Sequence, residues 1–343
     1  MTYAGVALIG AGMVANIHAA ALQEIPGAKI AGVWSRNPEA AASFAAKYGV
    51  RAYRSYEEAL ADPAAGVVSL CLPPGLHVDF GLEAAAAGKH LIVEKPLDID
   101  VAKARRLIGT YRAKQLTLAV ILQNRFTPAA QRVKAALLAG LLGKLILGDA
   151  YVKWYRSPEY YRSNAWRGTW TVEGGGALIT QAIHTIDLLQ WFMGGVQSVS
   201  GLIRTSLHSI DTEDLGVATV EYRNGAVGVI EGSTAIKPGY KERIEIHGSK
   251  GSFVLEGGLV REWKVEGCRE EDFVDAAKIS YGDVNSPAIS TVNHKAQLTD
   301  ILQAVATGRE PSVTGEEGLK SLEIVLGIYE SARRGQKVAL AST

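Results

Sequence analysis

The order of apolar and polar positions divides the chain into two parts. Up to about residue 122, short apolar runs alternate with segments whose apolar residues recur at helical spacing. This alternation is typical of a doubly wound parallel sheet with right-handed crossovers. The expected strands are Val6–Ile9, Lys29–Trp34, Arg51–Tyr53, Gly66–Leu72, His90–Val93 and Thr117–Leu122, and the expected helices include Pro38–Tyr48, Ser55–Ala61 and Val101–Gln115.

Beyond Gln123 the pattern changes to longer β-rich segments. The turn Arg223-Asn224-Gly225-Ala226 predicts a type I′ hairpin, which requires positive φ at both central residues. Strands in such a succession form a mostly antiparallel sheet that can leave one face open to a partner subunit. We therefore expect an α/β domain over residues 1–123 and an α+β domain over residues 124–343. The strands expected in the second domain are Gly143–Arg156, Val196–Thr205, Asp214–Arg223, Ala226–Thr234, Lys241–His247 and Gly251–Leu255, and the helices are Pro128–Leu142, Ala177–Trp191, Thr291–Thr307 and Glu316–Arg334.

Composition and charge argue against several classes of function. The 343 residues are 48% apolar and 21% charged, with a formal net charge of +1, so nothing favours nucleic acid or an anionic membrane as a partner. Cys71 and Cys268 have no metal-ligand spacing, which argues against a disulfide framework and a metal site. No Lys or Arg precedes Lys29, so a secretory signal is not indicated. We expect a globular, cytoplasmic protein.

The first expected strand runs directly into Gly10-Ala11-Gly12-Met13-Val14-Ala15. A G-x-G-x-x-A order between a strand and a helix predicts a dinucleotide-binding turn. Gly10 makes the tight turn, Gly12 lets the backbone approach a pyrophosphate, and the helix N-terminus supplies N–H donors. We expect Gly10, Gly12, Met13 and Val14 to contact the cofactor; the alternative is a plain βα turn.

The second expected strand ends at Ser35-Arg36-Asn37. NAD-preferring sites carry an Asp or Glu there, which holds the ribose 2′-hydroxyl. A hydroxyl beside a guanidinium can instead bind a 2′-phosphate through charge-assisted hydrogen bonds. Ser35 and Arg36 therefore favour NADP over NAD, although stacking of Arg36 on adenine and use of both dinucleotides stay open.

Glu94-Lys95-Pro96 closes the apolar strand His90–Val93. Open α/β sheets bind their ligands beyond the carboxyl ends of the strands, and proline restricts the backbone that leaves the strand. Lys95 can therefore hold its ammonium above a cofactor, with Glu94 beside it. The alternative is an ordinary Glu-Lys pair that faces solvent.

The strand Gly66–Leu72 ends in two prolines at the same edge of the sheet. We expect Leu72 and Pro73 to lie beside the cofactor. His77 either faces that ligand or only begins the helix that follows.

A second group of polar residues lies on the expected helix Ala177–Trp191, after Gly174-Gly175-Gly176. Thr180, His184 and Asp187 are spaced i, i+4 and i+7, so they share one face of an α-helix. His184 can take and give a proton near neutral pH, and Asp187 can orient its ring. The alternative is a core histidine satisfied by Asp187.

Taken in this order, the motifs make the chain similar to the glucose–fructose oxidoreductase / inositol dehydrogenase / MocA family. The resemblance implies an N-terminal Rossmann domain, a C-terminal domain on an open antiparallel sheet, and dimers or tetramers formed through that sheet. It also implies NAD(P)-dependent oxidation or reduction of a sugar, cyclitol or related polyol. The segments that carry it are Gly10–Ala15, Pro73–His77, Glu94–Pro96, Gly174–Gly176 with His184 and Asp187, Gln123–Phe126 and Trp166–Thr169.

The resemblance also implies roles for single residues. Lys95 contacts the reacting oxygen, His184 is the acid/base, and Asp187 orients it. The implied cofactor contacts are Glu94, Lys95, Gln123, Trp166 and Arg167, and the implied substrate contacts, besides Lys95 and His184, are Arg125, Tyr155, Thr180 and Gln181.

One departure bears on the substrate. Inositol dehydrogenases of the family carry an Asp four residues before the His, where this chain has Thr180 followed by Gln181. Neutral hydrogen-bonding groups in place of a carboxylate favour sugars, glycosides or nucleotide sugars over inositol. Two other hypotheses stay open: a dinucleotide-binding regulator without chemistry, and a glycosidase that oxidises its substrate transiently at C3 and returns the hydride.

Overall fold

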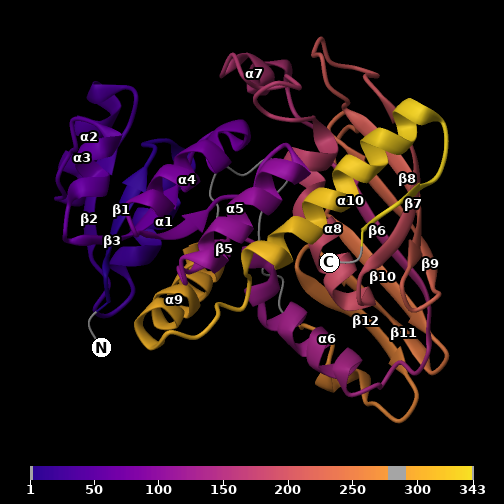
Figure 1. The fold of residues 1–343 in the computed structure, drawn as a ribbon. Coiled ribbons are helices and arrows are strands. Elements are labelled where there is room, and N and C mark those ends of the chain that lie inside the picture. The colour runs from indigo at the N-terminus through magenta and orange to yellow at the C-terminus, as the bar shows by residue number, and fades with distance from the viewer. Residues whose placement is uncertain (1–2, 277–290, 342–343) are drawn as a thin grey trace. The chain divides into compact units, whose positions relative to one another are not determined.

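The computed structural model describes residues 3–276 and 291–341 (Figure 1). The chain forms two compact units. Unit 1 consists of Met1–Gln123 with Ser290–Leu319, and unit 2 consists of Asn124–Ile289 with Lys320–Thr343. The expected division after Gln123 coincides with the first passage between the units. The expectation of a second domain unbroken to the C-terminus is wrong, because residues 290–319 return to unit 1.

Unit 1 is built on a parallel sheet with the strand order β2-β1-β3-β4-β5. This confirms the expected α/β class of the first half. The expected strand at Arg51–Tyr53 is wrong, since Ala52 forms only an isolated parallel bridge with Val33 before Ser55 caps the next helix. The strands are β1 (Gly5–Ile9), β2 (Ile30–Trp34), β3 (Ala65–Leu70), β4 (His90–Val93) and β5 (Leu118–Val120).

Local signals set the ends of the connecting helices. The Asn37 side chain accepts hydrogen bonds from the backbone N–H groups of Glu39 and Ala40 at the start of α2, and Gly49 ends this helix at φ +65°. For this reason α2 has the bounds that the sequence predicted. The helices are α1 (Met13–Gln23), α2 (Pro38–Tyr48), α3 (Tyr56–Ala61), α4 (His77–Ala86) and α5 (Val101–Ala113).

Helix α9 (Thr291–Thr307) belongs to the core of unit 1, although it follows the sheet of unit 2 in the sequence. Its Leu298 and Ile301 are buried in one cluster with Ala15, Ala19 and Leu22 of α1. Burial of this apolar face against α1 is what makes α9 part of unit 1.

Unit 2 is built on an eight-stranded sheet with the order β12-β11-β10-β6-β9-β8-β7-β13. All neighbouring strands with a printed register are antiparallel except β6 and β9, which run parallel. The expected sheet class is therefore confirmed, while β12 and β13 were not predicted. The strands are β6 (Leu145–Lys153), β7 (Val196–Arg204), β8 (Leu215–Tyr222), β9 (Val227–Ser233), β10 (Arg243–Gly248), β11 (Gly251–Glu256), β12 (Leu259–Val265) and β13 (Val338–Ala339).

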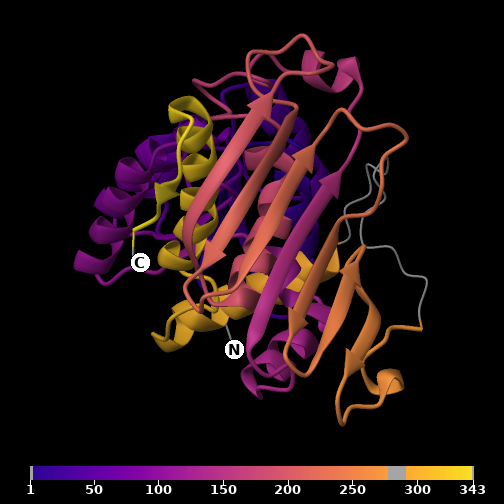
Figure 2. The same cartoon turned by 90° about the vertical axis from the view of Figure 1, so that its right-hand side faces the viewer.

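Helices cover one face of this sheet. A Cβ on Gly216 of β8 would lie 2.6 Å from a methyl carbon of Leu178, and a Cβ on Gly201 of β7 would lie 2.7 Å from one of Ile328. Figure 2 views the other face, where no helix of the described residues lies in front of the central strands. The helices of unit 2 are α6 (Pro128–Leu138), α7 (Pro158–Arg162), α8 (Ile183–Met193) and the greater part of α10 (Gly315–Arg334). Within the described part of the chain, no helix has the length and apolar character to span a membrane.

The expected hairpin joins β8 and β9, but its turn is not type I′. Gly225 has φ +86°, whereas Gln115 is the only non-glycine residue with positive φ among those described. Asn224 instead uses its side chain, which accepts a hydrogen bond from Ala226 N at 2.9 Å and donates one to Met193 O at 2.9 Å. A single left-handed glycine after a turn is the arrangement of a longer hairpin loop with a bulge.

Candidate active site

The first βα turn has the geometry that a dinucleotide requires. Gly10 has φ +114°, and a Cβ there would lie 2.4 Å from the carbonyl oxygen of Cys71, so only glycine fits. Gly12 is the N-cap of α1, where a Cβ would meet no atom within 4 Å. The first turn of α1 contains no acidic residue. The helix N-terminus is thus open to an anion, as the expected pyrophosphate contacts of Gly10, Gly12, Met13 and Val14 require.

Ser35 and Arg36 directly follow β2, the neighbour of β1 in the sheet. The Ser35 hydroxyl accepts a hydrogen bond from the Asn37 backbone at 3.3 Å, and the Arg36 side chain is exposed. This position suits contact with the adenosine end of a dinucleotide. The preference for NADP stays a prediction.

Gln123 lies at the end of unit 1, in the short η2 turn (Gln123–Phe126). Its side-chain oxygen is buried and has no hydrogen-bond partner among the described residues. A buried acceptor of this kind is costly unless a bound molecule supplies a donor. The residues of unit 1 thus fit the expected dinucleotide at the βα turn and at Gln123.

A buried ion pair holds the backbone that presents Lys95. Glu94 follows β4 and is 8% exposed. Its Oε2 accepts a hydrogen bond from the Lys95 backbone at 3.1 Å, and its Oε1 lies 2.9 Å from His18 Nε2. His18 Nδ1 in turn lies 2.9 Å from the Ser69 hydroxyl. Side chains of α1 and β3 therefore position the carboxylate that anchors Lys95. The expected cofactor contact of Glu94 stays a prediction.

The contacts of His18 and Glu94, taken together, outweigh the effect of burial on the pKa of each residue. Burial alone raises the pKa of Glu94, but the hydrogen bond and charge of His18 bring it down to about 2. Burial alone lowers the pKa of His18, but Cys71 and Glu94 raise it to about 10. Both groups are therefore charged near neutral pH. His294 of α9 completes the cluster, since one nitrogen or oxygen of each of the three side chains lies within 4.8 Å of the others. The expectation that the chain binds no metal stays a prediction.

The expected cofactor contact of His77 is wrong. Its ring is fully buried, with Nδ1 2.8 Å from the carbonyl oxygen of Pro96 and Nε2 3.0 Å from that of Leu72. His77 also begins α4, as the alternative proposed. By bridging the two loops, it supports the backbone that follows Lys95. The cofactor contacts of Leu72 and Pro73 stay predictions.

In unit 2, Glu213 caps the helical segment that carries His184. Its carboxylate accepts hydrogen bonds from the backbone N–H groups of Gly176 at 2.8 Å and Leu178 at 2.9 Å, and from the Tyr329 hydroxyl at 2.8 Å. A Cβ on Gly176 would lie 1.8 Å from the Glu213 carbonyl oxygen, which explains a glycine at this position. Sequence reasoning missed Glu213 and Tyr329, because no short-range spacing links them to the glycines.

The segment that carries His184 begins with a wider turn than predicted. Leu178–Ala182 forms a π-helical turn, and α8 follows it. Because π bonds run from i to i+5, the expectation that Thr180, His184 and Asp187 share one face of a single α-helix is wrong. Thr180 and His184 are partly exposed, whereas Asp187 is 1% exposed. The Thr180 hydroxyl donates to Gly176 O at 2.7 Å. Single π turns occur frequently at functional sites, and this one lies directly before His184.

Asp187 forms a bidentate ion pair with Arg125. Arg125 Nε donates to Oδ2 at 2.8 Å and Nη2 donates to Oδ1 at 2.7 Å. The two residues are 2% and 1% exposed. The buried guanidinium of Arg125 is engaged by a carboxylate of the same unit, which indicates a structural role; its expected substrate contact stays a prediction. The orienting role of Asp187 stays a prediction.

Gln181 links the π turn to the aromatic span before it. Its Oε1 accepts a hydrogen bond from Arg156 at 2.8 Å, and its Nε2 donates to the Tyr160 hydroxyl at 2.9 Å. The Arg167 guanidinium lies 4.9 Å from the ring centre of Trp166. Tyr155 follows β6 and is partly exposed. The substrate contacts of Tyr155, Thr180 and Gln181, and the cofactor contacts of Trp166 and Arg167, stay predictions.

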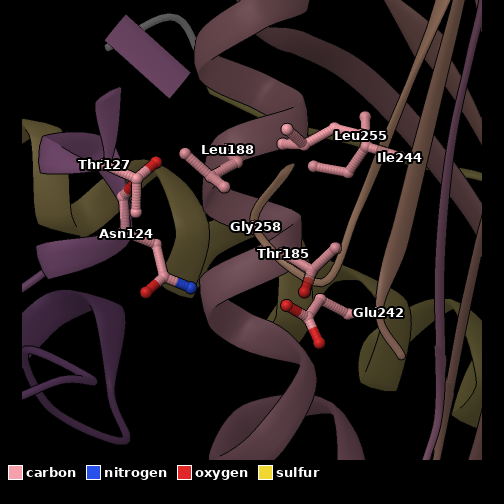
Figure 3. A pocket seen from close by; sticks show the side chains of 8 residues that line it. All are labelled: Asn124, Thr127, Thr185, Leu188, Glu242, Ile244, Leu255 and Gly258. Carbon is pink, nitrogen blue, oxygen red and sulfur yellow. The ribbon is translucent and has the colours of Figure 1, made fainter. Parts of the chain in front are cut away.

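A cavity of about 30 Å³ lies beside α8 within unit 2 (Figure 3). Figure 3 shows the Glu242 carboxylate next to Thr185, and burial raises the pKa of Glu242 to about 7. This volume accommodates about two water molecules and is far too small for a sugar. The cavity by itself therefore cannot hold the substrate that the sequence predicts. Its lining residues are Asn124, Thr127, Thr185, Leu188, Glu242, Ile244, Leu255 and Gly258.

Lys95 belongs to unit 1 and His184 to unit 2. Each is carried by a backbone that buried ionisable side chains hold in place: Glu94 with His18 for Lys95, and Glu213 for the segment of His184. The hypothesis that both side chains meet at one substrate oxygen stays a prediction.

Comparison with known proteins identifies relatives along most of the chain. A family model described as "Oxidoreductase family, NAD-binding Rossmann fold" matches residues 4–122, and one described as "GFO/IDH/MocA C-terminal domain" matches residues 130–254. The oxidoreductase sll0816 of Synechocystis sp. is 30% identical over 77% of this chain and 74% of its own. The myo-inositol 2-dehydrogenase of Thermotoga maritima is 26% identical over 98% of each chain.

A solved structure extends the similarity to the whole fold. The WlbA dehydrogenase from Bordetella pertussis, in complex with NADH and UDP-GlcNAcA, is 30% identical, covers 100% of this chain and 99% of its own, and aligns with a TM-score of 0.90. Together with the two matching family models, this similarity shows that the chain belongs to the Gfo/Idh/MocA family of oxidoreductases with an NAD-binding Rossmann fold.

Proposed function

We propose that the chain transfers a hydride between a nicotinamide dinucleotide and a secondary hydroxyl or ketone of a sugar, glycoside or related polyol. The observation that carries the proposal is the anchored Lys95, whose backbone N–H is held by the carboxylate that pairs with His18. A protein that only binds the dinucleotide needs no lysine on a backbone held in this way, next to the strand end where the cofactor is expected. The activities of the relatives, a myo-inositol 2-dehydrogenase and a dehydrogenase in complex with NADH and UDP-GlcNAcA, support the same class of reaction.

Lys95 and His184 are the catalytic residues in this proposal. When bound, the nicotinamide supplies the acceptor or donor of the hydride. The Lys95 ammonium stabilises negative charge that develops on the substrate oxygen, while His184 takes the hydroxyl proton, or gives it back in the reverse direction. Thr180 and Gln181 hold the substrate through neutral hydrogen bonds.

For the cofactor, we propose NAD(P) with a preference for NADP. Arg36 is exposed after β2 and Ser35 precedes it, so a 2′-phosphate would meet a guanidinium and a hydroxyl rather than a carboxylate. The ratio of kcat/KM for the two dinucleotides measures this preference. A large preference for NAD would contradict it.

Replacement of the ammonium tests the proposed chemistry. Lys95→Ala should lower kcat by about two orders of magnitude or more, as loss of one oxyanion-stabilising group does in other enzymes. Dinucleotide affinity, measured by fluorescence titration, should stay close to that of the unchanged chain. Lys103→Ala is the matched control, since this exposed lysine pairs only loosely with Asp79 at 4.0 Å.

The outcome also separates the alternatives. Full activity of Lys95→Ala would remove Lys95 from the mechanism. Dinucleotide binding without reduction by any sugar or polyol would indicate a regulator. Glycoside cleavage without net reduction of the dinucleotide would indicate the glycosidase.

We also propose that two or four copies assemble through the helix-free face of the unit 2 sheet. Leu202, Val217 and Val227 on this face are 63%, 38% and 51% exposed, and strand pairing puts them on the same side, because Leu202 pairs with Val217 and Val227 pairs with Glu221. Exposed apolar side chains that lie together mark interaction surfaces. Light scattering of the chain should report a dimer or tetramer, and Val217→Asp should shift it towards the monomer. A monomeric parent chain would refute the assembly.

A further inference from the structure

Two arginines of unit 2 share one tyrosine ring next to the π turn. The guanidinium of Arg156 lies 5.4 Å from the ring centre of Tyr160, and that of Arg167 lies 4.1 Å from it. Each guanidinium also lies near a tryptophan ring. That of Arg156 is 5.2 Å from the ring centre of Trp154, and that of Arg167 is 4.9 Å from the ring centre of Trp166. The aromatic rings thus keep two cations close together.

The backbone of Arg156 is fixed by its neighbours. Its N–H donates to Thr234 O at 2.9 Å, and its carbonyl oxygen lies 2.8 Å from His208 Nε2. His208 is held in turn by Asp214, 3.0 Å from its Nδ1. The Cα from which the Arg156 side chain extends is therefore held in place.

Two like charges in one partly buried place are unfavourable without an anion. Burial lowers the pKa of Arg156, and the charge of Arg167 lowers it further. The carboxylate of Glu173 also acts on Tyr160, so one carboxylate shares this place with two guanidinium groups. In addition, Arg167 Nε is buried and has no hydrogen-bond partner among the described residues. A bound oxyanion would add negative charge beside the two guanidinium groups and accept hydrogen bonds from the fork of Arg167.

Gln181 joins this pair of arginines to the predicted substrate site. Arg156 Nη2 donates to Gln181 Oε1 at 2.8 Å. Gln181 lies in the π turn Leu178–Ala182, beside Thr180 and one turn before His184. An oxyanion held by the arginines therefore lies within the reach of a sugar whose hydroxyl is near His184.

We propose that Arg156 and Arg167 bind an oxyanion of the substrate, so that the chain acts on sugars bearing a carboxylate or a phosphate in preference to neutral sugars and polyols. This inference rests on the proposed function and names the substrate class of the same site. It assigns Arg167 to the substrate rather than to the cofactor contact that the family resemblance implies.

Matched substrates test the inference and identify the source of the oxyanion. With the dinucleotide saturating, kcat/KM is measured for D-glucose, D-glucuronate, UDP-glucose and UDP-glucuronate, and calorimetry gives the affinity for each sugar. At least one anionic member should exceed D-glucose by 10-fold or more, roughly the effect of one charge-assisted hydrogen bond. A preference for D-glucuronate points to the carboxylate, and one for UDP-glucose points to the diphosphate. Equal use of D-glucose would overturn the inference.

Substitutions then show whether the arginines cause the preference. Arg156→Gln and Arg167→Gln should each reduce the ratio of anionic to neutral kcat/KM by about 10- to 100-fold. Arg156→Lys should lose less, because it keeps the charge but not the planar fork. Arg162→Gln is the matched control: this arginine lies in the same segment, has a side chain that is 70% exposed and pairs with Glu159. Its ratio should not change.

The ratio of kcat/KM for anionic and neutral sugars distinguishes failure of the inference from failure of the proposed function. If no sugar reduces the dinucleotide, the proposed function fails on this panel, and calorimetry still tests whether D-glucuronate or UDP-glucose binds more tightly than D-glucose. If Arg156→Gln or Arg167→Gln raises KM for the dinucleotide and leaves the ratio intact, that arginine serves the cofactor and its part of the inference is refuted. A fold defect lowers both rates together and leaves the ratio unchanged, so it cannot imitate the expected result.

Discussion

The bidentate pair of Arg125 and Asp187 predicts a large loss of stability when one partner is removed. Both side chains are almost fully buried, with relative exposures of 3% and 2%, and Gln190 Nε2 adds a hydrogen bond to Asp187 at 3.3 Å. Arg125→Met removes the guanidinium but keeps much of its apolar stem. Asp187 is then left as a buried carboxylate without its cation.

The expected magnitude follows from the burial of both partners. Removal of one member of a buried ion pair costs about 3–5 kcal/mol in the free energy of unfolding, because the other charge is left uncompensated. Replacement of both by apolar side chains is often close to neutral. The double variant Arg125→Met/Asp187→Leu should therefore regain most of the stability that Arg125→Met loses.

Urea unfolding followed by tryptophan fluorescence measures this effect in the relevant unit. The chain has six tryptophans, and of these only Trp34 lies in unit 1, so the signal reports mainly on unit 2. Arg162→Met is the control, because an exposed ion pair contributes about 0–1 kcal/mol.

The same variants decide between a structural role and substrate binding for Arg125. If Arg125→Met is as stable as the control but has lost its activity, Arg125 binds substrate and the reasoning from the ion pair is refuted. A double variant less stable than Arg125→Met would also contradict it, since no buried charge is then left without its partner.

Glu213 and Gly176 lead to two further predictions. Burial raises the pKa of Glu213 from 4.5 to about 7, so the folded chain binds this proton more tightly than the unfolded chain does. The resulting stabilisation, about 3 kcal/mol, is complete below about pH 4.5 and is lost as the pH rises through 7. Glu213→Gln should remove this part of the slope between about pH 5 and pH 8, and an unchanged slope would show that Glu213 does not titrate there. Gly176→Ala should destabilise the chain by about 1–3 kcal/mol, because its Cβ would meet the Glu213 carbonyl oxygen at 1.8 Å. Urea unfolding measures this loss. Gly109→Ala on α5, whose Cβ would meet nothing within 4 Å, should leave the free energy of unfolding unchanged or raise it.

Short-range signals in the sequence were enough for most elements of unit 1 before Gln123 and for the tight turn after β1, although the strand expected at Arg51–Tyr53 was wrong. Helix α2 begins after the Asn37 cap and ends at Gly49, and Ser55 caps α3 by accepting from Glu58 N at 3.1 Å. Gly10 was predicted correctly as a tight turn, since a Cβ there would meet the Cys71 carbonyl oxygen, whereas the approach of a pyrophosphate at Gly12 stays a prediction. Such features depend on a few neighbouring residues, whose conformational preferences the sequence contains directly.

Regular residue spacing within one segment was a less reliable guide to the local backbone conformation. The spacing of Thr180, His184 and Asp187 assumed an α-helix, but the turn before α8 is a π turn. The prediction of a type I′ turn assumed left-handed φ at both Asn224 and Gly225. In the structure the Asn224 side chain instead forms hydrogen bonds with Met193 and Ala226. At Asn224 one of these partners, Met193, belongs to another segment, and a periodicity argument does not include such contacts.

The partners of the buried charged groups depend on the tertiary structure alone. Glu94 meets His18 across 76 positions, Asp187 meets Arg125 across 62, and Glu213 reaches Gly176 across 37. A carboxylate that leaves water needs a compensating donor or cation wherever the fold supplies one, and neither its identity nor its distance in the sequence is encoded locally. The motifs therefore predicted which residues are chemically able to act, whereas the packing of distant segments decided which of them are used to hold the structure and which stay accessible to a ligand.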